Sequence, residues 1–230
     1  LGHDDKTATD PDYQKLLANA DINAVLIATP NLLHKEIVLA ALEAGKHVMC
    51  EKPMAISIDE CKAMTSAAEK RPDQVVLYTM QLRYSPRYQE LRKHIDAGKI
   101  GKPKHILMAE FRGDWNRGDV WQYDDPKQGK VNWRFSHAAS GGTLNEFSCH
   151  YLDLLHWMAG ERPIAISGTG GIMVYKDGRD TRDELAIGLG AVAEGVALAG
   201  AADVVAVGQV AHGLRREGLV RRPVALGLLH

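Results

Sequence analysis

Short apolar runs alternate with longer segments of helical spacing in the first part of the chain. The short runs predict strands at Ala24–Ala28, Lys46–Cys50 and Val75–Thr79. Continuous runs of this length are typical of strands that are buried on both faces. Between them, apolar residues at helical spacing predict helices over His34–Gly45 and Ser57–Lys70. Single helices between buried strands indicate right-handed βαβ crossovers and a parallel sheet.

The ends of these two helices carry their own signals. Gly45 closes the first helix as a C-cap glycine. Ser57 is placed as the N-cap of the second, and Glu60 completes a capping box with it. The predicted boundaries therefore rest on capping chemistry as well as on periodicity.

Polar residues follow each predicted strand at its carboxyl end. They are Thr29-Pro30-Asn31, Glu51-Lys52-Pro53 and Gln81–Tyr84. Ligands of open α/β sheets bind just beyond these ends, so we expect the three segments to face one ligand crevice. The alternative is an ordinary solvated loop after each strand, and the repetition at three strand ends favours the crevice.

The pattern becomes richer in turns from about residue 99, and we place domain boundaries at 1–98, 99–184 and 185–230. Trp115, Trp121 and Trp133 follow in the second segment, interleaved with charged residues. Sugar C–H faces stack on aromatic rings while charged groups take the hydroxyls, so these residues predict a pocket for a polyhydroxylated ligand. Aromatic residues of a half-buried sheet would give a similar pattern.

A second helical stretch, Ser140–Gly160, presents three ionisable groups on one predicted face. Glu146, His150 and Asp153 are spaced at i, i+4 and i+7. A base on a rigid helix suits alcohol oxidation, because the hydroxyl proton must leave as the hydride does. Two structural alternatives remain: Thr143 and Glu146 fit a capping box, and a helix histidine can be a satisfied polar group.

Composition and charge narrow the class of partner. The 230 residues carry a formal net charge of -1, with a pI of about 6.9. No overall basic field attracts nucleic acid or an anionic membrane, which favours a small-molecule partner. Cys50, Cys61 and Cys149 lack CxxC spacing, so we expect neither disulfides nor a metal site, and a reducing cytoplasm suits them.

Three motifs together resemble the Gfo/Idh/MocA family of oxidoreductases. They are "AVLIATPNLLHKEIVLAALEAGKHVMCEKPMA", "LRYSPRYQELRKHIDAGKIGKP" and "GGTLNEFSCHYLDLLHWMAG". The resemblance covers roughly residues 12–184. It implies an α/β fold with a partial Rossmann-type parallel sheet, followed by an α+β domain with a mainly antiparallel sheet that often pairs in homo-oligomers.

The resemblance also implies NAD or NADP as the cofactor and assigns roles to residues. Lys52 matches the lysine that holds the reacting hydroxyl, His150 matches the base, and Glu146 stands where the family commonly has Asp. Together with Lys52, the predicted cofactor contacts are Thr29, Pro30, Asn31, His34, Glu51, Pro53, Gln81 and Arg83. The predicted substrate contacts are Arg83, Trp115, Trp121, Trp133, Arg134 and Asp153.

Three functions fit this resemblance. The first is an NAD(P)-dependent dehydrogenase of a sugar, cyclitol or related polyol. The second uses transient oxidation for a redox-neutral reaction, as in NAD-dependent glycosidases. The third is a nucleotide-sensing protein or an inactive fragment. Lys52 and His150 occur together, which favours an enzyme.

Both ends of the chain depart from the family pattern. No GxGxxG turn, which would hold a pyrophosphate, precedes Ala24, so we expect a fragment of the nucleotide-binding domain. Residues 185–230 consist mostly of Gly, Ala, Val and Leu, and out-of-frame translation is our hypothesis for them. Glu194 and Asp203 argue against a membrane segment by interrupting the apolar runs.

Overall fold

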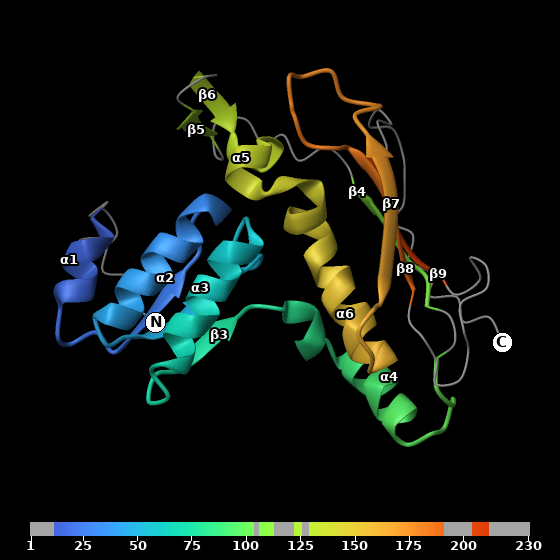
Figure 1. Cartoon of the computed structure of the whole chain (residues 1–230), viewed down its shortest axis with the longest axis horizontal. Helices are drawn as coiled ribbons and strands as arrows, with labels where there is room; N and C mark the ends of the chain where they lie inside the picture. Colours follow the sequence, from blue (N-terminus) through green and yellow to red (C-terminus); the bar gives the residue numbers. More distant parts are fainter. Residues whose placement is uncertain (1–11, 104–105, 113–121, 126–128, 191–203, 212–230) are drawn as a thin grey trace. The chain divides into compact units, whose positions relative to one another are not determined.

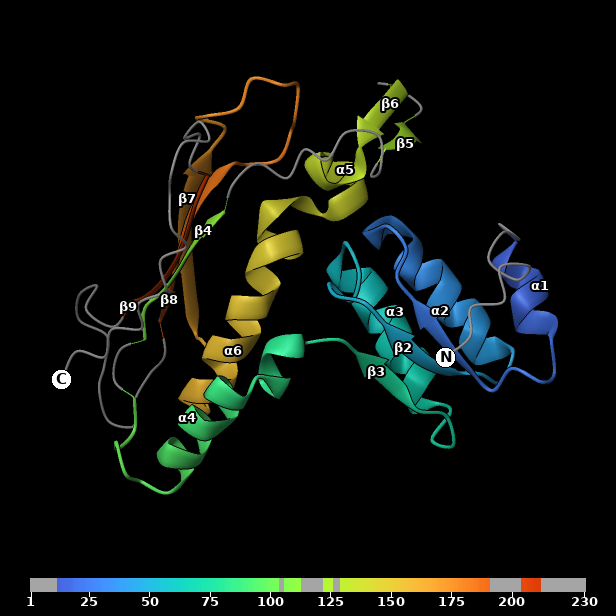
Figure 2. The ribbon, with the colours of Figure 1, turned by 180° about the vertical axis from the view of Figure 1, so that it is seen from behind.

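The computed structural model describes residues 12–103, 106–112, 122–125, 129–190 and 204–211, and it forms two compact units (Figures 1 and 2). The units divide between Thr79 and Met80, before the boundary after residue 98 that the change in composition suggested. Helix α4 (Pro86–Asp96) accounts for the difference. Its side chains Tyr88, Leu91 and Ile95 pack against the apolar core of the second unit.

The first unit contains the predicted parallel sheet. Its strands are β1 (Ala24–Ile27), β2 (His47–Cys50) and β3 (Val76–Tyr78), in the order β1-β2-β3. Both pairings are parallel, and Cys50 pairs with Ile27 on one side and Tyr78 on the other. The predicted strands and their parallel pairing are confirmed, whereas the prediction that the strands are buried on both faces is wrong, because one face is exposed.

Two helices cover one face of this sheet, and a shorter one precedes it. They are α2 (His34–Glu43) and α3 (Ile58–Glu69), preceded by α1 (Tyr13–Ala18). The apolar core between helices and sheet includes Val38, Ala41, Leu42, Val48, Cys50 and Met64. Apolar side chains also lie on the other face, where Leu26, Met49 and Leu77 occupy paired positions and are exposed.

The predicted helix caps are present. Gly45 has a φ of 77°, the left-handed conformation that closes α2. The Ser57 hydroxyl accepts a hydrogen bond from the N–H of Glu60 at 3.2 Å. The Glu60 carboxylate reaches back to the N–H of Ile56, also at 3.2 Å, so it bonds the residue before the N-cap. The capping residues were thus predicted correctly, with a shift of one residue in the second contact.

The second unit is built on a mainly antiparallel sheet, as the resemblance implied. Its order is β4 (Met108–Arg112), β9 (Val204–Ala211), β8 (Glu184–Gly190) and β7 (Ala165–Gly171). Strand β4 runs parallel to β9, and the other two pairings are antiparallel. Strands β5 (Gln122–Asp125) and β6 (Gly129–Asn132) form a separate antiparallel pair.

Helices α4 and α6 (Cys149–Ala159) cover one face of the larger sheet (Figures 1 and 2). Leu154 and Leu155 of α6 are buried against Leu185 and Ile187 of β8. Ala186 between them is exposed, so β8 has the alternation expected of a sheet with one covered face. Residues 185–187, which lie in the third of the predicted segments, therefore pack as part of the second unit.

Each helix within the described ranges is too short or too polar to cross a lipid bilayer.

Candidate active site

The carboxyl ends of the three parallel strands are joined by hydrogen bonds. The Glu51 N–H donates to the Ile27 carbonyl at 2.9 Å, and the Thr79 N–H donates to the Cys50 carbonyl at 3.0 Å. The Lys52 N–H donates to the Thr79 hydroxyl at 3.2 Å. The backbone that carries Glu51 and Lys52 is therefore fixed between both neighbouring strands. Sequence reasoning missed Thr79, although a hydroxyl at the end of the adjacent strand is a recognisable signal.

The imidazole of His34 links the two predicted cofactor loops. Its Nδ1 lies 2.8 Å from the Pro53 carbonyl oxygen, and its Nε2 lies 3.0 Å from the Thr29 carbonyl oxygen. The side chain is 0% exposed. Both ring nitrogens thus face backbone carbonyls of the loops, and a nitrogen that carries a proton can donate to its carbonyl, so His34 packs between Thr29 and Pro53 from inside. The Lys52-Pro53 peptide between these contacts is cis.

One polar atom in these loops suits a hydrogen-bonding ligand. The Thr29 hydroxyl oxygen is buried and has no hydrogen-bond partner among the described residues. Buried hydroxyls are normally paired, and a ribose hydroxyl or a carboxamide could supply the partner. This edge of the sheet therefore fits the nicotinamide half of a dinucleotide, whereas the pyrophosphate-binding turn has no counterpart in the sequence before Ala24.

In the second unit, the predicted helix over Ser140–Gly160 consists of several pieces. Helix α5 (His137–Ser140) ends at Gly141, and Gly141 and Gly142 both have positive φ, at 78° and 85°. A π-helix, η5 (Leu144–Ser148), then leads into α6. The expected α-helical spacing of Glu146 and His150 is therefore altered, because a π-helix bonds i to i+5. Glu146 lies in the π-helix, and His150 and Asp153 lie in α6.

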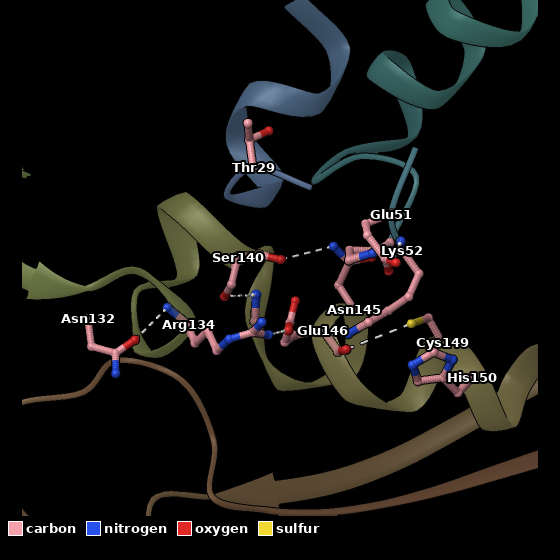
Figure 3. Close-up of polar contacts among 12 residues, drawn as sticks. Thr29, Glu51, Lys52, Asn132, Arg134, Ser140, Asn145, Glu146, Cys149 and His150 are labelled. Atoms are coloured by element: carbon pink, nitrogen blue, oxygen red, sulfur yellow. Dashed lines mark hydrogen bonds and ion pairs between the residues drawn. The ribbon is translucent and has the colours of Figure 1, made fainter. Parts of the chain in front are cut away.

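Glu146 is fully buried and forms an ion pair with Arg134 (Figure 3). Arg134 belongs to the short helix η4 (Trp133–Phe135), where its N–H donates to the Asn132 side chain at 3.1 Å. We predicted Glu146 as catalytic and Arg134 as a substrate contact, whereas the structure pairs their charges with each other. The capping alternative for Glu146 is also wrong, because the Thr143 hydroxyl donates to the Arg182 carbonyl and makes no cap contact.

His150 lies at the start of α6 with its side chain 7% exposed. Its Nε2 is 3.4 Å from the amide nitrogen of Gln81, in the short helix η2 (Gln81–Tyr84). An amide N–H donates, so this contact places the unprotonated form of Nε2 against Gln81. A neutral, mostly buried imidazole held in one orientation is what proton abstraction requires.

Asp153 and Arg83, both predicted as substrate contacts, bind one another. Arg83 Nε donates to Asp153 Oδ2 and Nη2 donates to Oδ1, each at 2.7 Å. The guanidinium carbon also lies 5.6 Å from the ring centroid of Trp157. The hydrogen bonds and charge of Asp153 raise the pKa of Arg83 above its usual value. This bidentate pair ties η2 to α6 one turn beyond His150.

The predicted aromatic pocket is described in part. Trp133 is buried, with the Arg134 guanidinium carbon 4.3 Å from its ring centroid, so it packs in the interior. Trp115 and Trp121 lie outside the described residues, and their role in substrate binding stays a prediction. In the described part of the chain, no three His, Cys, Asp or Glu side chains gather in a way that could hold a metal ion.

Two family profiles match different parts of the chain. A profile described as "Oxidoreductase family, NAD-binding Rossmann fold" matches residues 4–79, and one described as "GFO/IDH/MocA C-terminal domain" matches residues 88–211. The chain belongs to the Gfo/Idh/MocA family. The second match runs past residue 184, where we expected the family pattern to end, and it includes strands β8 and β9.

Individual Gfo/Idh/MocA proteins are similar over about two thirds of the chain. Levoglucosan dehydrogenase of Pseudarthrobacter phenanthrenivorans is 36% identical over 155 residues, which is 65% of this chain and 36% of that protein. Inositol 2-dehydrogenase of Salmonella paratyphi B is 31% identical over 150 residues, or 65% and 39%. The 2,7-anhydro-N-acetylneuraminate hydratase of Mediterraneibacter gnavus is 31% identical over 166 residues, or 72% and 41%.

A solved structure of levoglucosan dehydrogenase in complex with NADH and levoglucosan has a TM-score of 0.71 at 30% identity, covering 89% of this chain and 52% of that one. The chain thus spans about two fifths of the length of the curated relatives and about half of this structure.

Proposed function

We propose that the chain is part of an NAD(P)-dependent dehydrogenase that oxidises a carbinol of a sugar, cyclitol or related polyol. The observation that carries this proposal is His150, a mostly buried imidazole whose Nε2 accepts from the Gln81 amide. Lys52 supplies a cation on a loop whose backbone is fixed by the neighbouring strands. The similar dehydrogenases of levoglucosan and inositol support the substrate class.

His150 has the role of the base in this reaction. The carbinol takes the place of the Gln81 amide, whose N–H occupies the single lone pair of Nε2, and its O–H proton then passes to Nε2. Lys52 donates a hydrogen bond to the same oxygen, which stabilises the negative charge that develops there. Lys52 can do this from a defined position because its own N–H is bonded to the Thr79 hydroxyl and the Glu51 N–H to the Ile27 carbonyl.

NAD or NADP would lie against the strand-end loops of the first unit. The loops that His34 joins carry the predicted cofactor contacts, and the buried hydroxyl of Thr29 would gain a partner from the nicotinamide end. When bound, the nicotinamide ring supplies the acceptor for the hydride. His34 contributes from the interior by fixing Thr29 and Pro53.

The test is to supply NAD and NADP separately with levoglucosan, myo-inositol and a panel of other polyols, and to follow the absorbance of the reduced nicotinamide. The proposal predicts polyol-dependent reduction that is lost in His150→Ala. Full activity of His150→Ala would exclude His150 as the base. No reduction with any polyol would count against the dehydrogenase.

The similar hydratase favours a second candidate, a reaction that uses the cofactor without net oxidation. In that case Lys52 and His150 would act on the same carbinol, but the hydride would return before product release. Turnover of an anhydrosugar with no net reduced nicotinamide, detected by chromatography, would favour this candidate over the dehydrogenase.

Two wider proposals concern the setting of the protein. Thr169 and Ala186 are paired on the face of the second sheet opposite the buried Leu185 and Ile187, and both are exposed. Small side chains allow a second sheet to approach closely, which supports a homo-oligomer through this face. Light scattering tests this proposal.

The free cysteines Cys50, Cys61 and Cys149 support a reducing, cytoplasmic location.

A further inference from the structure

Two polar contacts fasten the turn η2 to helix α6. The Gln81 amide nitrogen lies 3.4 Å from His150 Nε2, and Arg83 forms two hydrogen bonds of 2.7 Å with Asp153. Gln81 and Arg83 lie two residues apart on one turn, while His150 and Asp153 lie three apart on one helix. The two contacts therefore run side by side between the same two elements.

The Arg83–Asp153 contact is the more directional of the two. Both carboxylate oxygens and two guanidinium nitrogens are engaged, which fixes the relative orientation of the groups as well as their distance. Trp157, one turn after Asp153, lies beside the guanidinium. The amide contact of Gln81 is longer and has one hydrogen bond, so it depends on how η2 is held.

We propose that Arg83 and Asp153 are positioning residues that keep the Gln81 amide against Nε2 of His150. The inference rests on the proposed function, in which His150 takes the carbinol proton. With the amide N–H donating to Nε2, the ring proton resides on Nδ1, which is the tautomer that can act as a base through Nε2. The carbinol O–H takes the place of the amide at Nε2 before it gives up its proton, because this nitrogen has a single lone pair.

Two other roles for the pair make different predictions. A substrate ligand would need free hydrogen-bonding capacity, whereas Arg83 and Asp153 direct their bidentate geometry at each other. A purely stabilising pair would affect unfolding alone, and the Arg83 side chain is 41% exposed, where ion pairs stabilise little. Loss of a substrate contact raises KM, loss of stability lowers Tm, and loss of positioning lowers kcat.

The kinetic test uses Arg83→Gln and Asp153→Asn with NAD and the polyol that the wild type oxidises best. Positioning predicts a fall in kcat of about tenfold or more, since small misplacements of a reacting group are costly, with KM within about twofold. The charge-reversed double variant Arg83→Asp/Asp153→Arg should recover part of kcat. A changed KM at unchanged kcat would overturn the proposal in favour of substrate binding.

Lys102 and Glu161 provide a matched control, because they also form an ion pair within the second unit. Lys102→Gln and Glu161→Gln should leave kcat unchanged. Arg83→Lys keeps the charge and loses the bidentate fork, so it should lower kcat while leaving Tm close to that of the wild type. An Arg83→Lys enzyme with full kcat would contradict the need for the bidentate geometry.

A spectroscopic test separates this inference from the proposed function. The ring nitrogens of His150, observed by NMR in the protein without substrate, should show Nε2 unprotonated and Nδ1 protonated. In Arg83→Gln and Gln81→Leu, we expect the two signals to move toward averaged tautomers, and in Lys102→Gln to stay in place. An unchanged His150 spectrum would overturn the positioning role, whatever the activity. Inactivity toward all polyols with the predicted spectral change would reject the proposed function alone.

Discussion

The fully buried carboxylate of Glu146 forms an ion pair with the guanidinium of Arg134 (Figure 3). Glu146 lies four residues before His150 in the chain. Glu146 belongs to the π-helix and Arg134 to η4, so the pair joins the segments on either side of Gly141 and Gly142. A buried charge without its partner is strongly destabilising. We therefore assign Glu146 a structural role: its ion pair holds the π-helix that precedes α6 against η4.

Replacing Arg134 with Met should lower the free energy of unfolding by about 3 kcal/mol or more, because Glu146 would remain buried without its counter-charge. Urea unfolding followed by circular dichroism measures this change. The double variant Arg134→Met/Glu146→Leu should recover much of the loss, since no charge is then buried. Equal stabilities of Arg134→Met and the wild type would contradict the assignment.

Ser57→Ala should destabilise the first unit by about 1 kcal/mol, because α3 loses the hydroxyl that accepts from the Glu60 N–H. Ser85→Ala is the matched control: Ser85 precedes α4 at the same position but its side chain makes no cap hydrogen bond. Thermal unfolding of the two variants should therefore differ. Identical losses would show that the cap contact adds nothing.

Asp183 gives the fold a dependence on pH at the acid end. Burial acts to raise its pKa, but hydrogen bonds from the N–H groups of Tyr175, Met173 and Val174 outweigh this and lower the pKa below its ordinary value. Its stabilisation is therefore present above the pKa of the unfolded chain and is lost as the pH falls through the lower, folded value.

Asp183→Asn should lower the free energy of unfolding at pH 7 by about 1–3 kcal/mol, since an amide cannot accept from all three donors. The difference from the wild type should shrink as the pH falls through the lowered pKa of the folded state. Exposed Asp73→Asn serves as the control. A difference that stays constant over this range would argue against an ionised Asp183.

Cys50 should resist alkylation in the folded protein. Burial, with a smaller contribution from the Glu51 charge, raises the pKa of its thiol to about 12, and the thiolate is the reactive form. Treatment with iodoacetamide near pH 8 followed by mass spectrometry should leave Cys50 unmodified, while the same treatment in urea should label it. Rapid labelling of Cys50 in the native protein would be inconsistent with its burial.

The parallel sheet could be predicted because its signals are local. Strands β1 and β2 are short apolar runs with polar ends, and Ser57 and Gly45 mark helix boundaries through capping chemistry. Helix α4 was missed because its apolar side chains are few, with Tyr88, Leu91 and Ile95 forming a single narrow stripe. Such a stripe gives a weak periodic signal.

The partners of the site residues could not be predicted in the same way. Arg83 and Asp153 lie 70 positions apart, and the residues around each give no sign that the two side chains form a pair. The π-helix has no sequence period of its own, so Glu146 was expected on the same face as His150 and was found against Arg134. The sequence shows these acidic and basic residues without their partners, because the fold decides which opposite charges meet. They were therefore predicted to contact ligands.

A double-mutant cycle in kcat tests most directly our central proposal, that Lys52 and His150 act on the same carbinol. With NAD and a polyol that the wild type oxidises, Lys52→Ala and His150→Ala should each lower kcat by about 10²-fold or more, while the affinity for NAD stays nearly unchanged. The double variant should be far less impaired than the product of the two losses, because residues that act on one reacting group are not additive. A wild-type kcat in either single variant, or losses that multiply in the double variant, would contradict the account.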